Sequence, residues 1–335
     1  MAKIIFGFGT SHSPLLSTPP DKWHLRVEAD KKNPSLEYKE KSYTFDALAS
    51  LRKDENLEHQ SSLAVRTQRH EASQLAIKNL SDKFEESAPD VLIIIGNDQR
   101  EIFHENNTPA ISMLYGDSVD HMAIPAERLA KMPPGIAIGA QGCSAESDTI
   151  YPIDADLSSY IISSLTENHF DLTAMKALPD GANGKRGMSH AYGFIYRRIM
   201  TKPIPAVHVC LNTFYPPNQP TAARCVALGK AIGRAILNYD KELKVAVCGS
   251  GGLSHFVIDE DLDKLVVDGL EKLDLEALSS LPEELLCSGT SEIKNWITAA
   301  AIMAESNLKI SSSEYIPCYR SEAGTGNAMG FMTWN

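Results

Sequence analysis

The sequence predicts an α/β protein, a single layered α/β/α domain around a mostly buried mixed sheet. Two observations support this prediction. Short runs rich in Ile and Val recur between turn residues, and segments with helical periodicity lie between them. The runs are apolar throughout rather than alternating, which indicates strands that are buried on both faces.

The individual elements follow from these patterns. The apolar runs predict strands at residues 3–8, 91–95, 110–115, 205–211 and 244–248. The helical periodicity predicts helices at residues 65–86, 156–167, 222–239 and 291–305.

Residues 17–60 are polar, charged and Pro-bearing, and we expect no strand in them. They are interpreted as an insertion after the first strand, either surface decoration or a cover over a site at that strand's end. Residues 130–151 are loop-like and rich in Gly, Pro and Ser. Because the strand and helix pattern resumes unchanged after both segments, residues 1–335 are expected to form one domain.

The composition excludes several classes of protein. The chain has 335 residues, a formal net charge of -11, 43% hydrophobic and 22% charged residues, which are ordinary values for a globular protein. The negative charge argues against nucleic acid and anionic membranes as partners. The six cysteines are widely spaced and indicate free buried thiols. With no long apolar run and no signal-peptide pattern, we expect a cytoplasmic protein.

Reactive side chains follow several predicted strands directly, where open α/β sheets bind ligands. His12 follows the first strand within Gly-Thr-Ser-His-Ser-Pro, and a polar cluster at residues 96–101 follows the second. That cluster would also serve as a capped turn. His190 lies in Met-Ser-His-Ala-Tyr-Gly, and His255 ends the loop Gly-Ser-Gly-Gly-Leu-Ser-His. These histidines suggest acid/base chemistry near neutral pH.

Two alternatives remain open at this point. Ser250 or Ser254 beside a histidine would fit a hydrolase, although neither lies in a Gly-x-Ser-x-Gly turn. Glu292 lies at a predicted helix start, where a carboxylate complements the helix dipole. The same carboxylate beside His or amide ligands would make a metal site with open positions, as in non-haem Fe(II) oxygenases.

Taken in order, the segments TSHSP, IIIGNDQ, MSHAYGF, LNTFYPPNQPTAARCVALG, GSGGLSHFV and GTSEIKNW resemble the catalytic subunits of the type II extradiol dioxygenases. This family includes protocatechuate 4,5-dioxygenase and gallate dioxygenase. The resemblance covers nearly the whole chain outside residues 17–60. The GNDQ variant and the ending YRSEAGTGNAMGF are most similar to the 3-O-methylgallate dioxygenase branch.

The resemblance implies roles for particular residues. His12 and Glu292 match iron ligands, His190 and His255 match second-sphere histidines, and His255 would act as acid/base on a ring hydroxyl. Asn97 matches an active-site Asn. The family's second ligand histidine is replaced here by Gln99. Either Gln99 binds the metal, which is our preferred interpretation, or the metal is held weakly, or another histidine substitutes. The candidate substitutes are His59, His70 and His104.

The implied reaction uses Fe(II) and O2 to cleave a catechol-type or gallate-type aromatic acid beside its diol. Arg320 with Tyr319 is the predicted clamp for the substrate carboxylate, and Thr213 and Tyr215 are predicted to contact the ring or to pack their loop. No segment resembles the small helical α subunit of protocatechuate 4,5-dioxygenase, so a homodimer is expected. A hydrolase on the same scaffold and a metal-free binding protein are the alternative functions.

Overall fold

The computed structural model describes residues 1–181 and 187–335. Among these, nine strands form one sheet, and eight of them follow a single path of neighbours. In spatial order they are β11 (His255–Val257), β13 (Thr325–Trp334), β1 (Lys3–Thr10), β10 (Lys244–Ser250), β4 (Val91–Asn97), β9 (Ala206–Leu211), β5 (Ile111–Leu114) and β8 (Thr173–Met175), and β12 (Ile310–Tyr319) pairs with β13.

The sheet is mixed, as predicted. The central strands β1, β10, β4 and β9 are parallel. On one side β13 runs antiparallel to β1, and on the other β5 runs antiparallel to β9. Because the four central strands point the same way, their carboxyl ends meet at one edge, which is where α/β sheets place their sites.

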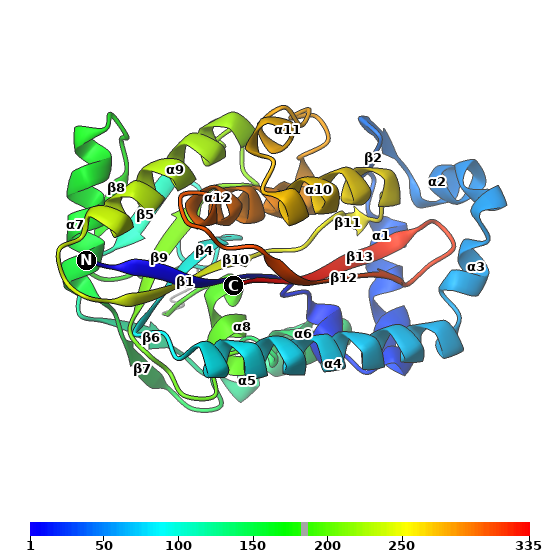
Figure 1. Cartoon of the computed structure of the whole chain (residues 1–335). Helices are drawn as coiled ribbons and strands as arrows, with labels where there is room; N and C mark the ends of the chain where they lie inside the picture. Colours follow the sequence, from blue (N-terminus) through cyan, green and yellow to red (C-terminus); the bar gives the residue numbers. More distant parts are fainter. Residues whose placement is uncertain (182–186) are drawn as a thin grey trace.

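Helices cover both faces of the sheet, so the layered α/β/α prediction is confirmed (Figure 1). The strand β4 shows why: Ile93 and Ile95 join one core cluster and Leu92 and Ile94 join the other. Successive side chains of a strand point to opposite faces, so an all-apolar strand needs cover on both. The helices on the first face are α7 (Ala155–Glu167), α9 (Ala222–Asn238), α10 (Glu260–Lys272), α11 (Leu275–Ser279) and α12 (Ile293–Met303). Those on the second include α4 (Leu63–Ser87) and α8 (His190–Arg198).

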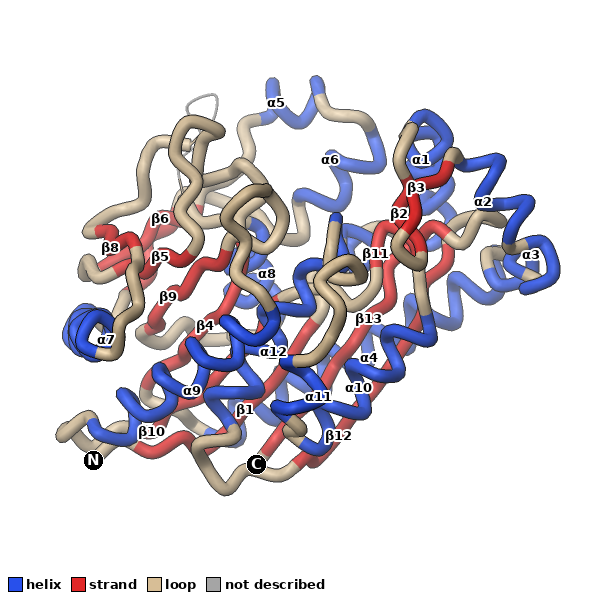
Figure 2. The backbone as a smooth tube through the Cα atoms, turned by 90° about the horizontal axis from the view of Figure 1, so that it is seen from above, coloured by secondary structure: helices blue, strands red, loops and turns tan. Residues whose placement is uncertain are grey.

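The segment at residues 17–60 differs from the expectation in one respect. It contains a short hairpin, β2 (Leu36–Tyr38) with β3 (Lys41–Tyr43), although no strand was predicted there. Its polar composition concealed the hairpin, because both strands are only partly buried. The remaining elements here are η1 (Pro14–Ser17), η2 (Pro20–Arg26), α1 (Val27–Lys32), α2 (Phe45–Leu51), η3 (Lys53–Glu55) and α3 (Leu57–Gln60). Figure 2 shows the hairpin beside β11 and β13.

The loop-like residues 130–151 also contain more structure than expected. The helix α6 (Pro134–Ala140) starts with a proline at its first position, where the missing N–H costs nothing. In the chain it follows α5 (Ala126–Lys131) and precedes β7 (Thr149–Pro152), which pairs antiparallel with β6 (Ser118–His121). All six cysteines are free, as predicted. No helix of the described residues is both long and apolar enough to cross a membrane.

Candidate active site

The carboxyl ends of three neighbouring strands bring the predicted motifs together. The strand β1 ends two residues before His12, β4 ends two residues before Gln99, and β10 ends directly before Gly251. A fourth segment, the one-turn helix η5 (Ser288–Glu292) leading into α12, delivers Glu292 to the same place. The site therefore lies where the sheet topology predicts a ligand.

Glu292 is the centre of this network. Its Oε2 accepts from the backbone N–H of Gly252 at 2.8 Å, and its Oε1 accepts from Gln99 Nε2 at 3.0 Å and from Asn97 Nδ2 at 3.1 Å. Burial disfavours the charged carboxylate, but the neighbouring histidines His12 and His255 outweigh it and hold the pKa of Glu292 well below its usual value. Glu292 is thus an oriented, ionised carboxylate rather than a simple helix-end charge.

His12 presents a lone pair to this carboxylate. The hydroxyl of Ser250 donates to the carbonyl of Ala191 at 2.6 Å, so it accepts from His12 Nδ1–H at 3.0 Å. That bond leaves Nε2 as the acceptor nitrogen, buried without a hydrogen-bond partner among the described residues and 3.2 Å from Glu292 Oε2. Two acceptors that face each other at this distance need a cation between them, either a proton or a metal ion.

His190, at the start of α8, lies beside His12, with ring centroids 4.7 Å apart. Its Nδ1 is 2.5 Å from Glu101 Oε2. Burial disfavours the imidazolium, but Glu101 outweighs it and raises the pKa of His190 to about 9. His12, His190 and Glu292 offer three ligand atoms within 4.8 Å of one another. A carboxylate behind a histidine is the usual arrangement for a metal-binding imidazole.

His255 is held in the opposite protonation state. Its Nδ1–H donates to the carbonyl of Leu253 at 2.8 Å, which leaves Nε2 as an acceptor 3.6 Å from Glu292 Oε2. Burial lowers the pKa of His255. A Cβ on Gly252 would lie 2.5 Å from the His255 ring, so only glycine fits there. His255 is therefore a neutral, fixed base next to the carboxylate.

These groups line one end of a cavity of about 770 Å³. The lining at this end includes His12, Gln99, Glu101, His190, His255 and Glu292. The rest of the wall is mostly apolar, with side chains from residues 122–144 and from Met188 and Phe256, and it also includes the charged residues Arg26 and Asp148. A large, partly apolar cavity with a few converging polar groups is typical of a small-molecule site.

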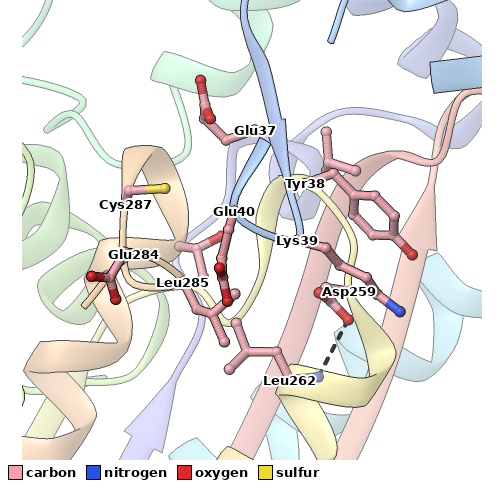
Figure 3. Close-up of a pocket in the computed structure, with 11 residues that line it drawn as sticks. Glu37, Tyr38, Lys39, Glu40, Asp259, Leu262, Glu284, Leu285 and Cys287 are labelled. Atoms are coloured by element: carbon pink, nitrogen blue, oxygen red, sulfur yellow. Dashed lines mark hydrogen bonds between the residues drawn. The ribbon is translucent and has the colours of Figure 1, made fainter. Parts of the chain in front are cut away.

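A second cavity, of about 20 Å³, holds little more than one water molecule. Figure 3 shows the acidic side chains around it, Glu37, Glu40, Asp259 and Glu284, with the carboxylate of Asp259 capping the N–H of Leu262. It is too small for an organic ligand.

The structure separates the candidates for the third ligand. His59 is exposed on α3, and His70 lies by Trp23. His104 contacts the carbonyl of Asp180. None of these three histidines lines the large cavity, whereas Gln99 and His190 do. Of the residues considered for a third ligand, Gln99 and His190 are therefore the two in the lining of the large cavity.

The predicted hydrolase nucleophiles are placed differently. Ser250 is fully buried and bonded to His12 and Ala191. Ser254 is fully buried as well, and its hydroxyl donates to Asp263 at 2.6 Å. Neither hydroxyl lines the large cavity, so neither serine is positioned to attack a ligand there.

The predicted substrate contacts lie outside the cavity lining. Asn97 is buried and orients Glu292 instead. Thr213 is buried, and the ring of Tyr215 stacks under Arg100 at 3.9 Å. The hydroxyl of Tyr319 donates to Glu260.

Arg320, the predicted clamp, is 1% exposed. Its guanidinium is bonded to both oxygens of Asp30, at 2.6 and 2.7 Å. It is therefore already neutralised by an acid from the inserted segment, and the cavity lining offers Arg26 and Arg128 in its place.

Other residues of the site were missed. Glu101 belongs to the polar cluster after β4, but its partner His190 is 89 residues away, so no local sequence pattern indicates the pair. Asn295 donates to Asn97 Oδ1 at 2.9 Å and to the carbonyl of Ser250 at 2.7 Å, which ties α12 to two strand ends. Its signal was its place one turn after Glu292.

The chain is similar to known dioxygenases. A model of the family described as the catalytic LigB subunit of aromatic ring-opening dioxygenase matches residues 56–326. A gallate dioxygenase from Pseudomonas putida is 54% identical over 41 residues, 12% of each chain. A 2,3-dihydroxyphenylpropionate/2,3-dihydroxicinnamic acid 1,2-dioxygenase from Comamonas testosteroni is 31% identical over 130 residues, 37% of each chain. The aligned segments thus span a minor part of these two relatives.

Proposed function

Because the chain belongs to the family of catalytic LigB subunits of aromatic ring-opening dioxygenases, we propose that it is an Fe(II)-dependent extradiol dioxygenase. The reaction would insert both atoms of O2 into an aromatic acid and open its ring beside two neighbouring hydroxyls. One observation carries the proposal: an imidazole nitrogen of His12, without a hydrogen-bond partner in the described part of the chain, faces the ionised carboxylate of Glu292 at one end of a large cavity.

The donor set fits a divalent metal. His12 and Glu292 would hold the ion, and a third residue would complete the site. With His190 the ligands would be two histidines and a carboxylate, and with Gln99 they would be a histidine, an amide and a carboxylate. The hydrogen bonds from His12 to Ser250 and from His190 to Glu101 fix both rings, as ligand histidines require. When bound, Fe(II) supplies open positions that gather the diol and O2 and polarise both.

The protein's own residues handle the protons. His255, neutral and with Nε2 free to accept, is suited to remove a proton from a ring hydroxyl. Where Gln99 and not His190 completes the metal site, His190 is kept protonated by Glu101 and is suited to donate one. Two histidines whose environments push their pKa values apart are the usual sign of a divided acid and base.

The substrate class is proposed from the relatives' names, since both name hydroxylated aromatic acids. Protocatechuate, gallate and 3-O-methylgallate are the compounds to test. We also propose that the chain assembles as a homodimer, which light scattering after gel filtration measures.

Oxygen uptake by the anaerobically prepared, Fe(II)-loaded protein tests the function. We expect about one bound iron and O2 consumption with at least one of the three acids. The Glu292→Gln variant should lose more iron affinity than the factor of about 10 to 100 that removing a hydrogen-bond partner of a metal ligand costs. Glu305→Gln, which removes only the charge of a partly exposed partner of Arg234, is the matched control.

If the iron-loaded protein consumes no O2 with any of the acids, the proposal fails. Zinc-dependent ester hydrolysis without O2 uptake would support the hydrolase alternative instead. Absence of metal binding together with tight binding of the acids would support the metal-free alternative.

A further inference from the structure

Arg26 lines the large cavity together with Arg128. It is the last residue of η2, and its side chain makes no hydrogen bond or ion pair within residues 1–181 and 187–335. The acid that acts on it electrostatically is Asp30. Both carboxylate oxygens of Asp30 are taken by Arg320, and one also accepts from Thr325 Oγ1 at 2.7 Å. Two guanidinium groups therefore lie near one carboxylate. Arg320 makes both hydrogen bonds to it, and Arg26 makes none.

Contacts around Arg320 connect the part of the cavity at Arg26 to the part at His255. Arg320 Nη1 donates to Asn327 Oδ1 at 3.3 Å, and Asn327 is the partner of His255 in the pairing of β11 with β13. Arg320 is close enough to lower the pKa of both His255 and Arg26. Asn327 and Arg26 both line the cavity. A ligand that reaches His255 is thus within the same enclosure as the unpaired cation.

The packing around Arg26 leaves it only partly exposed to water. A Cβ on Gly135 of α6 would lie 3.0 Å from Arg26 Cγ, so α6 and η2 approach closely at this point. Ile136 and Phe256 add apolar wall to the same cavity. Burial, together with Arg320, lowers the pKa of Arg26 to about 10, so the side chain is still charged at neutral pH. A cation in such surroundings is stabilised by an anion that enters them.

We propose that Arg26 binds the carboxylate of the aromatic ligand and sets the preference for acids over neutral rings; the ring chemistry itself rests on the proposed function. The planar guanidinium fork matches a carboxylate, and the pair is strengthened where water is excluded. Arg26 lies outside residues 56–326, the part that the family model matches. The inserted segment thus contributes substrate preference rather than surface decoration alone.

Calorimetric titration of the metal-free protein tests the anion site without turnover, with benzoate as the probe and benzamide as its neutral counterpart. We expect the wild-type protein to bind benzoate more tightly than benzamide. Arg26→Met should weaken benzoate binding about ten- to hundredfold and remove this preference. Arg26→Lys, which keeps the charge but not the fork, should restore part of it. Lys22→Met, an exposed change in the same helix η2, should behave as wild type.

Arg128 of α5 provides the competing outcome, because it also lines the cavity. If Arg128→Met loses benzoate and Arg26→Met does not, the assignment is overturned. Equal binding of benzoate and benzamide by the wild type overturns it as well. Thermal melting of each variant separates loss of the site from loss of the fold.

Turnover gives a second, independent readout. The ratio of kcat/KM for protocatechuate to that for catechol should fall about tenfold or more in Arg26→Met and stay unchanged in Lys22→Met. An unchanged ratio in Arg26→Met, with ring cleavage intact, refutes the carboxylate site and leaves the proposed function standing. If the wild type shows no O2 uptake but still binds benzoate in an Arg26-dependent way, the proposed function is refuted and the carboxylate site is kept.

Discussion

The two ends of the cavity are built in different ways. At the end formed by His12, His190, His255 and Glu292, called the catalytic end below, each of these side chains is held by at least one hydrogen bond. At the end formed by Arg26 and the apolar wall of α5 and α6, called the acid-binding end below, Arg26 and Arg128 have no partner in the described part of the chain.

Under the proposed function, the two ends have different roles. Groups that must transfer protons or hold a metal need fixed geometry, which a closed hydrogen-bond network on rigid strand ends supplies. A group that selects substrates needs only to be unpaired and desolvated until the substrate arrives. Changes at the catalytic end should therefore affect all substrates alike, and changes at the acid-binding end should affect acids alone.

The largest expected effect, on replacing His255, tests this division. Removing a general base costs about 10²- to 10⁴-fold in rate, so His255→Gln should lose that factor in kcat with protocatechuate and with catechol equally. Bound iron should be retained. His59→Gln, an exposed histidine, is the control. Loss of iron in His255→Gln would instead indicate that His255 is a metal ligand and would contradict its assignment as a base.

The pH profile of the wild type carries the same assignment. Burial lowers the pKa of His255 from its ordinary 6.5, so its base form persists to lower pH than that of a free histidine. The acid limb of kcat/KM should lie below pH 6.5, and His255→Gln should abolish it. A limb that persists in the variant belongs to another group.

Gln99→His is expected to have an intermediate effect, confined to the metal. Imidazole is a stronger ligand than an amide, so the variant should bind Fe(II) about 10-fold more tightly if Gln99 lies at the ion. The ratio of protocatechuate to catechol turnover should not change. Unchanged iron affinity in Gln99→His, with iron loss in His190→Gln, would assign the third ligand to His190. Fe(II) titration measures both.

The sequence predicted the catalytic end better than the acid-binding end, for a physical reason. His12, Gln99 and His255 each follow a buried strand within a few residues, and parallel topology brings such positions together. The predicted strands 91–95 and 244–248 each gained only two residues, in β4 and β10. The local pattern of apolar and polar residues was therefore enough to predict these strands and the polar residues that follow them.

Non-local pairing explains what was missed. Arg320 was predicted to bind the substrate carboxylate, but its partner Asp30 is 290 residues away, and only the folded chain reveals that both oxygens of Asp30 bond to its guanidinium. The strand β13 was not predicted, because its glycines weaken strand propensity, and it is fixed by pairing with β1, β11 and β12. Arg26 lay in a segment whose composition pointed to surface.

A last prediction concerns stability and not activity. Replacing His208 distinguishes loss of catalysis in acid from acid unfolding. His208, in β9, is buried away from the cavity, stacked on Tyr192 at 4.3 Å, and its Nε2 accepts from Tyr196. Burial, with His121 nearby, lowers the pKa of His208 to about 3 from an ordinary 6.5. The unfolded chain therefore binds a proton below pH 6.5 that the folded chain does not, and stability is lost as pH falls through this range.

Between pH 7 and pH 5 this single group should cost about 2 kcal/mol of unfolding free energy. His208→Phe keeps the stacking and cannot be protonated, so its free energy of unfolding, from urea titrations, should fall by about 2 kcal/mol less than the wild type over that interval. The hydrogen bond lost from Tyr196 changes the free energy of unfolding equally at pH 7 and at pH 5, so it cancels in the difference between them. Equal losses in the two proteins would show that His208 is not the acid-sensitive group. If the variant is more acid-stable while its kcat/KM still falls in acid, that limb belongs to the catalytic end and not to unfolding.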